Sequence, residues 1–212
     1  MKFALMFAGL ALFAAVEAHA QAQAEKLVGG PCEGCEAVFQ GRPATLASRA
    51  SLVAAGEPGE KLVLQGVVRD AAGKTAAGII VYAYQTNAAG LYPAPPNDRA
   101  GGAAARRHGM LRGFAVSDKD GTYRFDTVRP ASYPNSDLPQ HIHMHIVEPG
   151  RCTYYIDDVL FEDDPKLTPQ KRRSEVHGRG GNGVVQPQRT ADNGWQAKRD
   201  IVLGRGIVDY AS

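Results

Sequence analysis

The stretch that decides the fold class is Gln140-His141-Ile142-His143-Met144-His145-Ile146-Val147. Apolar residues alternate with histidines along it, and successive side chains of a β-strand point to opposite faces. We therefore predict a strand with one apolar face and one imidazole face, from which His141, His143 and His145 all project. Imidazoles two residues apart on a strand can reach one metal ion, so the stretch also indicates a candidate metal site.

Similar short runs of β-branched and aromatic residues lie on both sides of this strand. Turn-forming residues separate them, among them Asp118-Lys119-Asp120-Gly121, whose Asp-Gly pair predicts a hairpin. Short strands at this spacing are typical of a β-sandwich or barrel. We predict an all-β fold, a β-sandwich with long loops, and its further strands at 62–68, 79–84, 111–116, 122–125, 153–161 and 197–203.

The N-terminus has the pattern of a secretory signal peptide. Lys2 precedes an apolar run over residues 3–16, and small-x-small cleavage patterns end at residues 20 and 24. We expect residues 1–20 to be the signal, with cleavage after residue 24 as the alternative, and a periplasmic or secreted location. The apolar run is too short to span a bilayer and no lipid-attachment cysteine follows it, so no membrane anchor is expected.

The remaining length suits one domain with a sizeable core. Residues 21–60 carry glycine, proline and alanine with little periodicity and are expected to form an N-terminal arm, while residues 61–212 form the sandwich. The formal charge is only +2, and the locally basic runs 99–112 and 166–173 lack interleaved aromatic residues. No nucleic-acid partner is therefore expected.

The three cysteines, Cys32, Cys35 and Cys152, allow one disulfide in an oxidising compartment. Cys32 and Cys35 form a Cys-x-x-Cys motif, which in other settings serves redox chemistry or binds zinc. Here the motif lies in a glycine-rich loop and has no second pair. We expect a structural disulfide, for example one that ties the arm to Cys152.

Two tyrosine-bearing loops precede the histidine strand. The first block reads Gln85-Thr86-Asn87-Ala88-Ala89-Gly90-Leu91-Tyr92, the second runs from Ser117 to Tyr133-Pro134, and the third is Pro139-Gln140-His141-Ile142-His143. In this order they resemble the intradiol ring-cleavage dioxygenases, with the protocatechuate 3,4-dioxygenase beta-subunit branch closest in character. The resemblance extends over about residues 62–203.

The resemblance implies a non-haem Fe(III) cofactor and a catechol-type aromatic substrate. The ring would be opened by O2 between its two hydroxylated carbons, giving a muconate-type diacid, with Tyr133 as the displaceable ligand that receives a substrate proton. A phenolate is a hard oxygen donor that forms readily only near a strong positive charge, which suits a ferric ion. The positions that match the family's metal ligands are Tyr92, Tyr133, His141 and His143.

Two positions depart from the family pattern. Leu138 stands three residues before the first ligand histidine, where the family commonly has arginine, and Asp158 stands where it often has glutamine. The positive charge that stabilises the oxidised substrate must then come from elsewhere. Arg112, Arg129 and the Arg106-Arg107 pair are the candidates.

The other histidines and tyrosines have structural interpretations. His145 has no ligand counterpart in the family and is expected to support the site or the fold. His108 and His177 lie in predicted loops and are expected to be incidental. Packing in strands is the expected role of Tyr82, Tyr84, Tyr123, Tyr154 and Tyr155.

Other functional classes stay open. Gly66-Val67-Val68-Arg69-Asp70 and Asp118-Lys119-Asp120-Gly121-Thr122-Tyr123 also look like carboxypeptidase-regulatory-type domains, which are non-catalytic β-sandwich binding modules. Leu138 leaves room for a His-ligated metal-binding relative without turnover. The expected partners are the catechol-type substrate and O2, and a homo-oligomer is a further candidate.

Overall fold

The histidine-rich stretch forms strand β7 (His141–Glu148) in the computed structural model, which describes residues 26–32, 34–94 and 106–210. Ile142, Met144 and Ile146 point into the core, and the alternating histidines point to the opposite face of the sheet. The predicted division of this strand into an apolar face and an imidazole face is confirmed.

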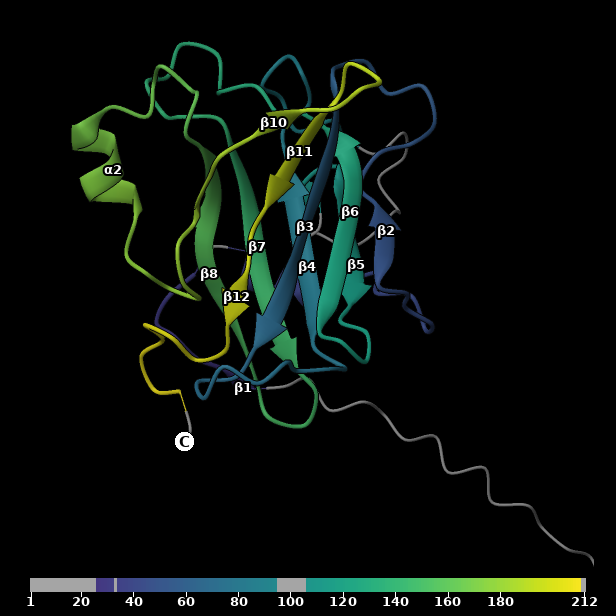
Figure 1. Cartoon of the computed structure of the whole chain (residues 1–212), viewed down its shortest axis with the longest axis vertical. Coiled ribbons are helices and arrows are strands. Elements are labelled where there is room, and N and C mark those ends of the chain that lie inside the picture. Colours follow the sequence, from purple (N-terminus) through teal and green to yellow (C-terminus); the bar gives the residue numbers. More distant parts are fainter. Residues whose placement is uncertain (1–25, 33, 95–105, 211–212) are drawn as a thin grey trace, which may run out of the picture.

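Two mixed sheets packed face to face make up the fold, and β3, β6 and β11 lie in front of β4, β7 and β8 in Figure 1. The first sheet has the order β1-β8-β7-β4-β5 with β9 beside β8, and it contains β1 (Lys26–Leu27), β4 (Ile80–Gln85), β5 (Arg112–Val116), β8 (Cys152–Phe161) and β9 (Val184–Val185). The second has the order β10-β11-β3-β6-β2 with β12 beside β3, and it contains β2 (Arg49–Ser51), β3 (Lys61–Arg69), β6 (Thr122–Val128), β10 (Gln188–Arg189), β11 (Trp195–Lys198) and β12 (Ile201–Val202).

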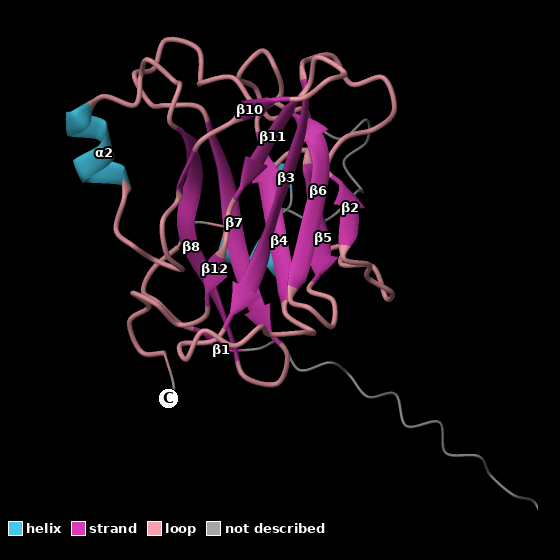
Figure 2. Cartoon of the chain, in the orientation of Figure 1, coloured by secondary structure: helices cyan, strands magenta, loops and turns pink. Residues whose placement is uncertain are grey.

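Helical structure among the described residues is short: the 3-10 helix η1 (Cys35–Phe39), the helix α2 (Pro169–Glu175), which Figure 2 shows in cyan, and residues 106–107. The all-β fold class is confirmed. In the described part of the chain no helix has the length and apolar character needed to cross a bilayer. The predicted signal peptide lies outside the described residues.

The main core lies between the sheets. Leu64 and Phe125 from the second sheet and Ile146 and Phe161 from the first are all fully buried there. Burying a side chain of this size stabilises a fold by roughly 1.5–3 kcal/mol. These contacts hold β7 rigidly from its apolar side.

A second apolar cluster covers the outer face of the first sheet. All six residues of β4 are buried, because Val81 and Ala83 face the main core while Ile80, Tyr82 and Tyr84 face outward. Val38 of η1 packs on these outward residues. The η1 segment of the expected arm therefore lies over the sheet face that carries the histidines. The strands of the arm extend the sheets instead, with β1 beside β8 in the first and β2 beside β6 in the second.

The prediction of a β-hairpin at residues 118–121 is wrong. The turn joins β5 to β6, but β5 pairs with β4 in the first sheet and β6 pairs with β3 in the second. Oδ1 of Asp118 accepts hydrogen bonds from the backbone N–H groups of Asp120 and Thr122. Such local bonds satisfy the turn whether or not the flanking strands pair with each other.

The strand predicted at 197–203 is two strands, β11 and β12, which both run parallel to β3. They are separated at Arg199, whose fully buried guanidinium donates to the carbonyl oxygens of Arg179 and Gly180. The backbone N–H of Arg199 still donates to Gln65 in β3, but the N–H of Val67, further along β3, donates to the side chain of Asp200 and not to a backbone carbonyl. A local β pattern does not predict this change of partner.

The suggested disulfide between the N-terminal arm and Cys152 is also wrong. The disulfide joins Cys32 to Cys35, and Cys152 is a free, buried cysteine in the main core at the start of β8. A buried free cysteine packs as a small apolar residue.

Candidate active site

Tyr92 and Tyr133 come from two loops that hydrogen bonds hold together. Thr86 Oγ1 donates to the carbonyl oxygen of Ala131 at 2.7 Å, and the backbone N–H of Ala131 donates to the carbonyl oxygen of Asn87 at 3.1 Å. One loop follows β4 and the other follows β6, so the two sheets contribute one tyrosine each.

Gly90 lets these loops approach. Its φ is +75°, a region that favours glycine, and a Cβ atom there would lie 2.1 Å from the carbonyl oxygen of Ser132. No other residue fits at this distance without moving one loop. The glycine two residues before Tyr92 thus sets the spacing between the two tyrosines.

Four donor atoms from these loops and β7 converge. Tyr92 Oη lies 2.7 Å from Tyr133 Oη and 3.0 Å from His143 Nε2. Tyr133 Oη lies 3.0 Å from His141 Nε2 and 3.5 Å from His143 Nε2. Ligand atoms about 2 Å from one metal ion are about 3 Å from each other. The structure therefore brings together all four residues of the predicted ligand set at spacings that one ion can bridge.

Both histidines turn the same ring nitrogen toward the tyrosines. His141 Nδ1 lies 2.7 Å from the carbonyl oxygen of Pro139, and His143 Nδ1 lies 3.0 Å from Oδ1 of Asp158. A carbonyl and a carboxylate only accept, so Nδ1 carries the proton in each ring and Nε2 presents its lone pair to the cluster. Metal-binding histidines are commonly oriented in this way.

Burial opposes charge on the cluster itself. Burial and the hydrogen bond with Tyr133 raise the pKa of Tyr92, and burial raises the pKa of Tyr133. Burial, together with the neighbouring His143, lowers the pKa of His141. Two neutral imidazoles and two phenols that ionise only beside a strong positive charge form a donor set that fits a trivalent cation.

Asp158 reaches His143 through a β-bulge. Ile142 pairs with Val159 and Met144 pairs with Ile156, so two residues of β8 lie opposite His143 alone. Burial disfavours the ionised carboxyl, but His143 and its neighbouring histidines outweigh this and hold the pKa of Asp158 below its usual value. The sequence did not place a carboxylate beside the histidine pair, because a bulge leaves no local signature.

Two sets of residues around the histidine pair could bind a metal ion: the four-residue set with the two tyrosines, and a set in which Asp158 takes the place of the tyrosines. The ligand atoms of His141, His143 and Asp158 lie within 4.8 Å of one another. Asp158, however, bonds the ring nitrogen of His143 that faces away from Tyr92. The convergence of the two phenols on Nε2 makes Asp158 a partner that orients His143.

A cavity of about 520 Å³ opens beside the cluster, a size typical of small-molecule sites. Tyr92, Tyr133 and His143 line one part of its wall, and Cys32 and His145 line another. His145 is 2% exposed, and burial lowers its pKa to about 3. It stays outside the four-residue cluster, as predicted.

His108 is not incidental, contrary to the sequence-based expectation. It is buried, lies with Nδ1 2.9 Å from Tyr82 Oη, and stacks on the ring of Tyr84 at 3.6 Å. Tyr84 in turn stacks on His143 at 4.4 Å. His108 therefore supports the wall of the cavity, whereas His177 does not line it.

One of the candidate arginines lines the cavity, and it is Arg107. Arg129 is bonded to Asp163 through two nitrogens, at 2.8 and 2.6 Å, and Arg112 donates to the carbonyl oxygen of Gln40. Leu138 is half-buried and lies outside the cavity wall. Among the described residues of the cavity wall, the arginine charge therefore comes from Arg107, in the segment between β4 and β5.

Known proteins resemble this chain in sequence and in fold. Residues 37–179 match the model of a family described as Dioxygenase. The chain is 30% identical over 147 residues to the protocatechuate 3,4-dioxygenase beta chain of Burkholderia cepacia, covering 58% of each. It is 30% identical over 151 residues to the chlorocatechol 1,2-dioxygenase of Rhodococcus opacus, covering 61% of this chain and 52% of the relative. The chain thus spans little more than half the length of these curated relatives.

A solved structure shares the fold. The dioxygenase domain of a dioxygenase carbohydrate-binding protein fusion from Streptomyces sp. SirexAA-E superposes with a TM-score of 0.55 at 24% identity. The match covers 76% of this chain and 90% of that chain. This chain therefore shares its sandwich fold with that domain.

Proposed function

Since this chain belongs to the intradiol ring-cleavage dioxygenase family, we propose that it is a non-haem iron enzyme acting on a catechol-type substrate. In the proposed reaction O2 opens the ring between its two hydroxylated carbons and yields a muconate-type diacid. Both oxygen atoms of O2 enter the product, so no other reductant is needed.

The observation that carries the proposal is the convergence of two phenols and two imidazoles beside a cavity. Tyr92, Tyr133, His141 and His143 would hold the ferric ion. When bound, the ion would supply Lewis-acid chemistry and a template for the two ring oxygens. A non-catalytic binding module of the same fold class does not require two tyrosines and two histidines that converge in this way.

Tyr133 is assigned the proton-handling role. Its Oη lies within 3.5 Å of Tyr92 Oη and of both histidine Nε2 atoms, and it lines the cavity. A substrate hydroxyl that enters the cluster there can pass its proton to the Tyr133 oxygen. Both groups are phenolic and similar in acidity, so the transfer is close to balanced. Tyr92 remains in place and keeps the spacing of the cluster.

Arg107 is assigned to the substrate. It is the arginine in the described cavity wall, and its guanidinium suits an anionic substituent on the ring. The cavity is large enough for one substituted ring, which is the substrate class that we propose.

A relative that binds iron but turns over slowly is the second candidate. Leu138 supplies no charge where the family commonly has arginine, and Asp158 is bonded to His143. Leu138 therefore favours altered substrate choice or rate, whereas Asp158, which orients His143, supports retained metal binding.

We also propose that the protein is exported. The basic residue, apolar run and small-x-small pattern of the first residues support a cleaved signal. The Cys32–Cys35 disulfide is of a kind that persists in oxidising compartments. Cell fractionation with and without residues 1–24 tests this, and retention of both forms in the cytoplasm would contradict it.

The visible spectrum of the iron-loaded protein tests the enzymatic proposal. We expect a coloured tyrosinate-to-Fe(III) band that shifts when catechol is added anaerobically, followed by O2 uptake and a ring-opened acid when air is admitted. A shift without O2 uptake would favour the slow or inactive relative. A colourless protein after iron loading and reoxidation would overturn the ferric assignment.

A further inference from the structure

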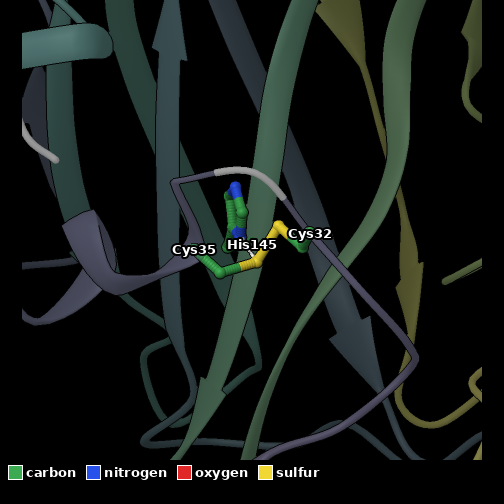
Figure 3. Close-up of side chains that lie close together, drawn as sticks. All are labelled: Cys32, Cys35 and His145. Atoms are coloured by element: carbon green, nitrogen blue, oxygen red, sulfur yellow. Dashed lines mark hydrogen bonds between the residues drawn. A yellow bond between two sulfur atoms is a disulfide. The ribbon is translucent and has the colours of Figure 1, made fainter.

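A second group of metal-ligand residues borders the same cavity, with two of its three members, Cys32 and His145, in the cavity wall. The disulfide between Cys32 and Cys35 lies beside the imidazole of His145 (Figure 3), with His145 Nδ1 3.7 Å from Cys35 Sγ. The ligand atoms of the three residues lie within 4.8 Å of one another. None of them has a part in the proposed ring cleavage.

We propose that reduction of the Cys32–Cys35 disulfide creates a second metal site, in which two thiolates and His145 bind a thiophilic cation such as Zn²⁺. A dithiol reductant supplies two electrons and two protons, the S–S bond breaks, and the reductant becomes a disulfide. Each cysteine thiol then loses its proton when the ion binds, so two protons are released.

The spacing supports this ligand set. A thiolate sulfur about 2.3 Å and an imidazole nitrogen about 2.0 Å from one tetrahedral ion are about 3.5 Å apart. The distance of 3.7 Å between Cys35 Sγ and His145 Nδ1 is already close to that value. Two of the three ligands therefore need almost no movement.

The backbone can hold these two ligands while the third adjusts. Cys35 is 4% exposed and opens η1, which Val38 anchors in the second apolar cluster, and His145 is fixed in β7. Cys32 is only half-buried and lies in the loop before η1. On reduction Cys32 is the residue that moves from bonding distance to ligand spacing.

The site would keep an open coordination position. Cys32 and His145 both line the cavity, so water or a small molecule can reach an ion held there. Three protein ligands with a fourth open position are characteristic of reactive zinc sites, whereas structural sites have four protein ligands. Tyr84 stacks on His143 at 4.4 Å and on His145 at 5.9 Å and so contacts one residue of each site.

Zinc binding by the oxidised and reduced protein tests the proposal. Both forms are dialysed against Zn²⁺ without oxygen. The reduced form is prepared with a trialkylphosphine, which donates two electrons to the disulfide and becomes the phosphine oxide, while water supplies its oxygen atom and the two thiol protons. We expect one more zinc per chain in the reduced form. Because the tyrosine and histidine cluster is present in both forms, zinc bound there cancels in the comparison. Equal zinc content would overturn the proposal.

Variants identify the ligands. His145→Gln should lower the affinity of the reduced protein for the extra zinc by at least about tenfold, as even partners of metal ligands do when they are lost. Cys152→Ser is the matched control and should leave it unchanged. Wild-type protein alkylated at the reduced thiols should lose the extra zinc without any substitution. Unchanged affinity in His145→Gln, or extra zinc retained after alkylation, would refute the assigned site.

Discussion

Asp158 and His143 are joined on the side of the imidazole that faces away from the tyrosines, with Oδ1 of Asp158 3.0 Å from Nδ1 of His143. Nε2 of the same ring lies 3.0 Å from Tyr92 Oη. The carboxylate therefore determines which nitrogen offers its lone pair to the cluster.

Replacing this carboxylate should weaken metal binding. We expect Asp158→Leu to lower iron affinity by about 10–100-fold, and Asp158→Asn, which keeps an acceptor oxygen, to lower it less. Titration with a competing chelator measures both. Asp163→Asn, a carboxylate paired with Arg129 away from the cavity, is the control. Wild-type affinity in Asp158→Leu would show that His143 needs no such partner.

The two tyrosines should differ in what they contribute. Tyr92→Phe and Tyr133→Phe should each reduce the intensity of the visible band and the iron content, because each removes a phenolate donor. Tyr133→Phe should also lower kcat by about 100-fold or more through loss of the proton acceptor. Tyr210→Phe, whose hydroxyl bonds Glu148 instead, should keep the colour. Full iron content in both cluster variants would leave a site built from histidines alone.

A methyl group at Gly90 should separate the tyrosine loops. Gly90→Ala places a Cβ 2.1 Å from the Ser132 carbonyl oxygen, so we expect loss of the visible band in a protein that still folds. Gly73→Ala is the matched control, since Gly73 also has a positive φ, +84°, but nothing lies within 4 Å of its Cβ position. The control should cost about 1 kcal/mol of folding stability and keep the colour. Equal iron spectra in the two variants would contradict this account.

His108 should make the stability of the iron-free protein depend on pH. Burial lowers its pKa to about 4, below the value near 6.5 of an unfolded chain. Between these values the unfolded chain takes up a proton that the folded protein does not, so stability is full above about pH 6.5 and falls toward about pH 4. Urea unfolding should show that His108→Asn removes about 2 kcal/mol of the loss between about pH 7.5 and about pH 5. The buried His145, whose pKa is also lowered, accounts for part of the pH dependence that remains in this variant. If the free energy of unfolding of His108→Asn changed with pH as steeply as that of the wild type, His108 would not be the responsible group.

Arg107 should select for charge on the substrate. With Arg107→Gln we expect kcat/KM for a carboxylated catechol to fall about fivefold relative to unsubstituted catechol, equivalent to about 1 kcal/mol for a partly solvated ion pair. The preference should also weaken with added salt. Arg106→Gln is the control, because Arg106 lies beside it and does not line the cavity. Parallel losses on both substrates would remove Arg107 from substrate selection.

The convergence of the four proposed ligands could be anticipated in part from local patterns and in part from the family resemblance, which alone singled out Tyr92 and Tyr133. Alternation in β7 determines which way His141 and His143 point, and both tyrosines lie in long loops next to recognisable strands. The packing of sheet against sheet then brings the loops together without any further signal in the sequence.

Features that arise between distant segments were not predictable. Asp158 meets His143 only because a bulge shifts the β7–β8 register, and His108 becomes part of the cavity wall only through its contacts with Tyr82 and Tyr84. Both are tertiary contacts with no local pattern of their own. The Cys32–Cys35 disulfide is different, because it joins two residues of one Cys-x-x-Cys motif and the sequence left its pairing open only because Cys152 was a competing partner.

The pairing of β1 with β8 affects how fast the chain can fold. Lys26 in the first described strand pairs with Cys152, which is far along the sequence. β3 likewise pairs with β11 and β12 near the C-terminal end of the described chain, so these pairings form only after distant segments have met. Folding that depends on such non-local pairing is slow, since a large loop must close before the contacts form. For the export that we propose, slow folding favours passage of the chain before the sandwich forms, and iron would then be bound outside the cytoplasm.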